Sequence, residues 1–64
     1  MQIRREVIVN LKTDKAFRGV LWSVRRRYLV LKNATLIEAG QQHEVPGEVI
    51  VERANIDFVQ AVPS

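Results

Sequence analysis

The sequence contains no cysteine and a single histidine, His43. No disulfide can form, and a structural metal site built from cysteine and histidine is excluded. A chain as short as this one buries only about 60% of the surface that its unfolded form exposes, so a lone monomer would be marginally stable. Small domains without disulfides or metals often gain stability from a partner subunit. We therefore expect the protein to self-associate.

Other absences narrow the functional class. No apolar run approaches the roughly 20 residues of a membrane span, and the opening MQIRRE lacks the apolar stretch of a secretory signal. We therefore expect a cytoplasmic protein with no membrane partner. The sequence shows no nucleophile paired with His43, no active-site pattern of carboxylates and no glycine-rich phosphate loop. We expect no enzyme activity, no cofactor and no bound metal.

What the sequence does have is a marked asymmetry of charge within a net charge of +3. The first 33 residues hold nine lysines and arginines against two acids, and the remaining residues hold one arginine against five acids. Such asymmetry favours a surface that faces a polyanion, or electrostatic contact between copies of the chain. Alternatively, the basic and acidic halves of the chain intermingle on the small surface of the folded protein, and their electrostatic potentials largely cancel.

Short runs of β-branched and apolar residues predict five strands, with no helical periodicity. They cover residues 6–12, 17–24, 28–38, 48–53 and 56–62, and the segment 40–47 is expected to be a loop. Gly19 lies within the second strand, where it indicates a bend, a bulge or a close backbone approach, and Asn33-Ala34 indicates a kink in the third. The pattern predicts an all-β fold, a small and strongly bent five-stranded antiparallel barrel. We expect one domain over residues 1–64, with a core of about 6–62.

Three segments resemble the Sm-like (LSm) proteins in order and spacing. LKTDKAFRGVL resembles the first signature of that family, YLVLKNA its third strand, and GEVIVERANIDFVQ its second signature. The spacing from Gly19 to Asn33 also matches the bacterial RNA-chaperone branch without a gap. The resemblance covers roughly residues 6–60. It departs at the start, because only Met1–Arg5 precede the first strand where the family has a helix, so we expect little or no N-terminal helix.

The resemblance implies a cyclic ring of identical subunits, in which the fourth strand of one subunit pairs with the fifth strand of the next. Here these would be residues 48–53 and 56–62, which would otherwise be exposed apolar edges. The resemblance also implies binding of single-stranded RNA, commonly uridine-rich, around the ring pore. The contacts would come from the loop between strands two and three and from the break between strands four and five.

On this sequence those two loops give five candidate RNA-binding residues: Arg25, Arg26, Arg27, Tyr28 and Arg53. The family pattern has Asp and Asn in the first loop, and Arg25 and Tyr28 stand near those positions. The second signature usually carries Arg-Gly or Lys-His, where this chain has Glu52-Arg53-Ala54. The base-reading pair is therefore lost or replaced, and we expect phosphate contacts to dominate.

Several alternatives remain open. The arginine triplet could be a solvated turn, Tyr28 could be strand filler rather than a stacking platform, and Arg53 could pair with an acid of a neighbouring subunit. The ring could also be a structural or protein-docking scaffold with no role in nucleic-acid binding. A monomeric SH3-like barrel that binds DNA non-specifically is a third hypothesis.

Overall fold

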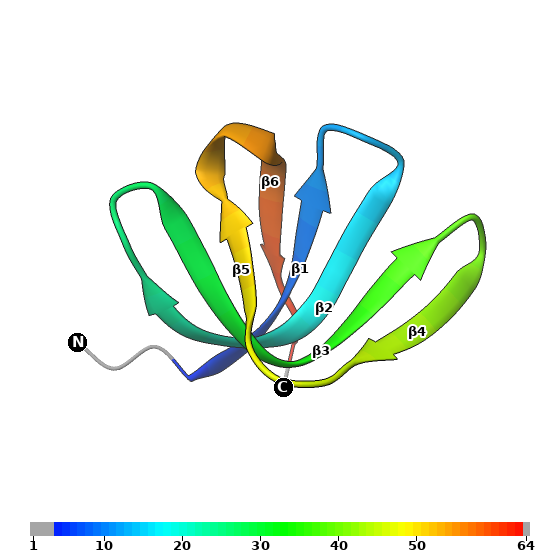
Figure 1. Ribbon diagram of the computed structural model, residues 1–64, viewed down its shortest axis with the longest axis horizontal. Helices are drawn as coiled ribbons and strands as arrows, with labels where there is room; N and C mark the ends of the chain where they lie inside the picture. The colour runs from blue at the N-terminus through cyan, green and yellow to red at the C-terminus, as the bar shows by residue number, and fades with distance from the viewer. Residues whose placement is uncertain (1–3, 64) are drawn as a thin grey trace.

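The computed structural model describes residues 4–63, which form six β-strands and one short 3-10 turn. The elements are β1 (Arg5–Leu11), β2 (Lys15–Val24), β3 (Tyr28–Glu38), β4 (Gln41–Val45), β5 (Val49–Glu52), η1 (Arg53–Asn55) and β6 (Ile56–Ala61). The prediction of a strongly bent, all-β antiparallel fold is confirmed (Figure 1). None of the described residues belongs to a helix long and apolar enough to cross a membrane.

The strands form one antiparallel sheet in the order β4-β3-β2-β1-β6. β3 is the longest strand and has two partners on the same side: its first half pairs with β5 and its second half with β4. In Figure 1 the sheet bends sharply in the middle of β2 and β3, so that the two halves of β3 rise in different directions. The bend therefore separates the end of the molecule that carries β5 and η1 from the β3–β4 hairpin.

The predicted count of five strands, and the prediction of a loop over residues 40–47, were wrong. Gln41–Val45 forms β4, which pairs with β3 from Ala34↔Val45 to Glu38↔Gln41. Ala39 and Gly40 make the turn between them, with positive φ angles of 51° and 76°. The sequence QQHEV shows no alternation of apolar and polar residues, and its first four residues are exposed. Backbone hydrogen bonds to β3, rather than side-chain burial, make this segment a strand.

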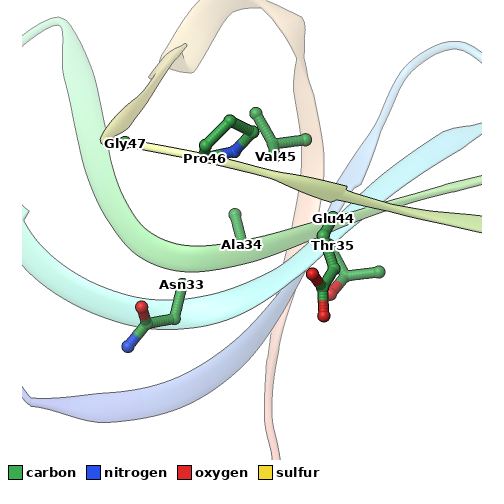
Figure 2. Close-up of a pocket in the computed structure, with 7 residues that line it drawn as sticks. All are labelled: Asn33, Ala34, Thr35, Glu44, Val45, Pro46 and Gly47. Atoms are coloured by element: carbon green, nitrogen blue, oxygen red, sulfur yellow. The ribbon is translucent and has the colours of Figure 1, made fainter.

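Gly19 and Asn33 create the bend. A Cβ atom on Gly19 would lie 3.0 Å from the carbonyl oxygen of Lys32 and 3.1 Å from the Cα of Ala34, so the close approach expected at this glycine is confirmed. Asn33 has a left-handed φ of 53°, which places the predicted kink in β3. Figure 2 shows Ala34 beneath the break between β4 and β5, with the Asn33 side chain on the opposite side of the strand.

The core lies on the inner face of the bent sheet. Val9 and Leu31 are fully buried at its centre, and the other buried members are Val7, Leu29, Ala34 and Val51. Along β1 and β5 these residues alternate with exposed or half-buried neighbours, as strands with one face in the core require. In β3, by contrast, Leu29, Val30 and Leu31 are buried in succession. The core therefore draws on both ends of the chain.

Three strands, β4, β5 and β6, leave backbone edges without a partner in the part of the chain that the structure describes. β4 and β5 each pair only with β3, and β6 pairs only with β1. The edges of β5 and β6 also carry exposed apolar side chains: Ile50 is 63% exposed and Phe58 51% exposed. Unpaired edges with exposed apolar groups favour pairing with another chain.

The expectation of little or no N-terminal helix concerns Met1–Arg5. Arg4 lies outside any regular element and Arg5 begins β1, while residues 1–3 lie outside the described residues.

Candidate nucleic-acid interface

Two loops that are distant in sequence meet at one end of the sheet. The β2–β3 turn closes on itself through a hydrogen bond of 2.8 Å from the Arg25 N–H to the Tyr28 carbonyl oxygen. The Arg53 N–H, at the start of η1, donates to the carbonyl oxygen of Arg27 across 2.9 Å. These are the two loops that the resemblance to Sm-like proteins implies as contact regions, and the second bond holds them side by side.

A pocket of about 590 Å³ opens where the two loops meet. We call it the arginine pocket, and its lining residues are Arg26, Arg27, Tyr28, Ile50, Glu52, Arg53 and Ala54. Four of the five candidate residues thus share one pocket. Arg25 is not among the lining residues, although it lies in the same turn.

Ile50 and Glu52 line the arginine pocket and were not candidates from the sequence. Their place follows from the pairing of β5 with β3, in which Glu52 stands opposite Tyr28 and Ile50 opposite Val30. Cross-strand partners of this kind project from the same face of the sheet. The family resemblance identified the loop that contains Arg53, and Glu52 directly precedes Arg53 in the chain. The resemblance gave no reason, however, to expect the side chain of Glu52 in the site.

The arginines of the pocket are free of ion pairs among residues 4–63. The ion pairs found there join Lys15 to Glu38, Arg18 to Glu6 and Lys32 to Glu48 at 3.1, 2.8 and 3.6 Å. The hydrogen bond and charge of Glu6 also raise the pKa of Arg18, so this guanidinium remains charged but already has a partner. Of the cations without an ion pair among residues 4–63, three line the arginine pocket, whereas Arg4, Arg5, Lys12 and Arg25 lie outside its lining.

Tyr28 is half-buried at the edge of the pocket, and the arginines around it are exposed. A partly exposed aromatic ring beside guanidinium groups matches what single-stranded nucleic acids require: a surface on which a base stacks and cations that contact phosphate. Ile50 adds an exposed apolar surface to the same hollow.

Trp22 lies on a different part of the surface. The guanidinium carbon of Arg4 is 3.4 Å from the centre of its ring, and the ammonium nitrogen of Lys32 is 3.7 Å from the same point. Both cations interact with the π system of the indole. Trp22 is half-buried and already in contact with cations, so it offers a base less stacking surface than Tyr28 does.

Two other hollows lack a group of several arginines. One, of about 410 Å³, lies at the kink of β3 and has Glu44 as its one ionisable lining residue (Figure 2). The other, of about 450 Å³, is largely apolar and includes the exposed Phe58 and Val59 of β6, and Arg53 lines it as well, beside the acidic Asp57. No group of three or more potential metal ligands occurs among residues 4–63.

Solved structures of Sm proteins have the same fold as this chain. A heptameric archaeal Sm protein superposes with a TM-score of 0.86 at 30% sequence identity, covering 97% of this chain and 91% of that one. The SmAP1 heptamer of P. aerophilum superposes with a TM-score of 0.87 at 30% identity, covering 98% and 85%. The Pyrococcus abyssii Sm protein in complex with a uridine heptamer gives 0.85 at 24% identity, covering 95% and 87%.

No protein-family model matches the sequence, and no curated protein matches it significantly. The likeness is therefore carried by the fold together with an identity of 30% to two archaeal proteins over almost the whole chain.

Proposed function

Because the chain belongs to the Sm-like family, we propose that it forms a cyclic ring of identical subunits that binds single-stranded RNA, mainly through phosphate contacts. The two archaeal relatives at 30% identity are heptamers, and a third protein of the same fold was solved with a uridine heptamer. The proposed contact residues are Arg26, Arg27, Tyr28 and Arg53, with Arg25 beside them in the same turn.

One observation carries this proposal: two separate loops bring three arginines and a tyrosine into a single pocket. None of these arginines takes part in an ion pair among the described residues. Grouping unpaired guanidinium groups costs free energy through mutual repulsion unless an anion binds. A phosphate backbone offsets this repulsion, and Tyr28 offers a surface to the bases.

The edges of β5 and β6 support the ring. Each carries an unpaired backbone edge within residues 4–63 and exposed apolar side chains. If β5 of one subunit pairs with β6 of the next, every such edge is satisfied by one repeated interface. The ring would also repeat the arginine pocket once in each subunit, so that one RNA strand contacts several pockets in succession.

The proposed role is binding without catalysis, in the cytoplasm. Its affinity is electrostatic in origin and falls steeply with salt. The test is filter binding of short poly-U, poly-A and mixed-sequence RNAs at two salt concentrations, combined with native mass spectrometry. Binding that weakens strongly with salt supports the proposal. Absence of binding even at low salt would leave a ring that acts only as a structural or protein-docking scaffold, and a purely monomeric spectrum would remove the ring.

A further inference from the structure

The arginine pocket contains one carboxylate, that of Glu52. Although three arginines line the same pocket, Glu52 forms no ion pair or side-chain hydrogen bond among residues 4–63. We propose that Glu52 reads the bound base, and that it selects guanine, and more weakly other bases with amino groups, over uracil. This inference rests on the proposed RNA-binding function and assigns the base preference of the same site.

The position of Glu52 suits this role. It stands directly opposite Tyr28 in the β3–β5 register, so the two side chains project from the same face. Side chains of opposed residues begin about 4.5–5.5 Å apart at their Cβ atoms. A base stacked on the Tyr28 ring therefore has its edge within reach of the Glu52 carboxylate. Arg53 follows Glu52 in the chain and is held against Arg27, which places cations for the phosphate beside the base.

The chemistry of a carboxylate decides which base it accepts. A carboxylate has only acceptor oxygens. The Watson–Crick edge of guanine presents two adjacent donors, N1–H and the 2-amino group, which match the two oxygens. Cytosine and adenine each offer one amino group. Uracil presents a single N–H between two carbonyl oxygens, and these oxygens repel a carboxylate. The expected order is therefore guanine first, cytosine and adenine next, and uracil last.

A purely electrostatic role for Glu52 predicts something different. If the carboxylate only offsets the charge of the pocket arginines, its removal strengthens phosphate binding to every RNA alike and leaves base preference unchanged. The two roles are thus separated by comparing several RNAs rather than by the affinity for one.

The experiment measures filter binding of heptamer RNAs in a lithium buffer, which prevents guanine quadruplexes. One heptamer is all uridine, and in the others every second position is guanosine, inosine, adenosine or cytidine. The wild-type protein is expected to bind the guanosine heptamer about tenfold more tightly than heptauridine. Inosine lacks the 2-amino group, so its heptamer is expected to fall between them.

Two variants of Glu52 complete the test. Glu52→Gln places an amide where it can donate to a carbonyl of uracil and accept from its N–H, so the preference for guanosine is expected to disappear or reverse. Glu52→Ala is expected to lose the preference without gaining one for uridine. Glu38→Gln is the matched control, because it removes the same charge at the opposite end of β3 and leaves the preference intact.

The outcomes separate this inference from the proposed function. RNA binding by the wild-type protein with no preference for guanosine overturns the role of Glu52 but leaves the function standing. If Glu52→Gln strengthens the binding of every heptamer equally and leaves the base preference unchanged, the role of Glu52 is likewise overturned and the function stands. Failure of the wild-type protein to bind any heptamer at low salt removes the proposed function, and the role of Glu52 with it.

Discussion

The backbone N–H of Arg53 donates to the carbonyl oxygen of Arg27 across 2.9 Å, although the two residues belong to different loops. Because this bond uses main-chain atoms, both guanidinium groups remain available to a ligand. The arrangement of the arginine pocket is thus held by backbone geometry, and single side chains in it can be exchanged with little effect on the fold. The predictions about binding rely on this division of roles, in which main-chain atoms hold the two loops together and side chains contact the ligand.

Reversing the charge of Arg26 is expected to weaken binding to all RNA sequences by a similar factor, because phosphate contacts carry no sequence information. The slope of log K against log salt should become shallower by about 0.7 for each phosphate of the single strand that the variant no longer neutralises. Filter binding of Arg26→Glu at several salt concentrations measures both effects. The control is Lys15→Glu, whose exposed ion pair with Glu38 lies outside the pocket. An equal decrease in affinity for both variants would assign the effect to net charge alone.

Substitutions of Tyr28 distinguish a ring that stacks on an RNA base from a ring that only stabilises the strand. Tyr28→Ala is expected to cost about 1–3 kcal/mol of binding free energy for each stacked base, while Tyr28→Phe keeps most of the affinity. Binding titrations and urea denaturation are measured on the same preparations. If Tyr28→Ala lowers the free energy of unfolding but leaves RNA affinity intact, the ring of Tyr28 serves the strand and not the ligand.

The exposed apolar side chain of Phe58 on β6 is expected to contribute to the interface between subunits. Phe58→Ser should shift the native mass spectrum from rings toward smaller species, since the variant has less apolar area for association to bury. Val24→Ser is the control, because Val24 is an exposed apolar residue of β2 that lies on neither edge strand. An unchanged distribution for Phe58→Ser would place the interface elsewhere.

Gly19→Ala is expected to lower the free energy of unfolding by about 1–3 kcal/mol, because the new methyl group would press on the backbone of Lys32 and Ala34. Asn33→Gly, at the kink that faces it, should be neutral or slightly stabilising, since glycine adopts a left-handed φ without strain. Urea denaturation at one fixed protein concentration tests both changes, because the stability of an oligomer depends on concentration. A stable Gly19→Ala variant would mean that β2 and β3 can separate at the bend.

Much of the fold was predictable, because the strands that build the core carry their own signal. The third strand was predicted at residues 28–38 and β3 has those bounds, since an apolar run from Leu29 to Leu31 continues through a kink marked by Asn33. β4 was not predictable in this way. Its side chains are mostly exposed, and what makes Gln41–Val45 a strand is the free half of β3 beside it. The second half of β3 becomes available to pair with β4 only after the bend has separated it from the first half, which pairs with β5.

The candidate site was predictable to a similar degree. The family resemblance identified the two loops, and the structure places four of the five candidate residues in one pocket. Glu52 and Ile50 were missed because their position depends on the register between β3 and β5. A shift of one residue in that register would turn both side chains to the other face. Loop membership can be read from sequence motifs, whereas the face on which a side chain projects requires the pairing.

The cation-lined indole of Trp22 has a practical consequence. It is the only tryptophan in the sequence, so all indole emission from the protein originates at this one place on the surface. Arg4, just before β1, and Lys32, in β3, contact its ring. Lys32 also pairs with Glu48 beside β5. A rearrangement that separates Glu48 from Lys32 would therefore change the charged surroundings of the fluorophore, so the emission of Trp22 reports on the local structure where β5 leaves β3.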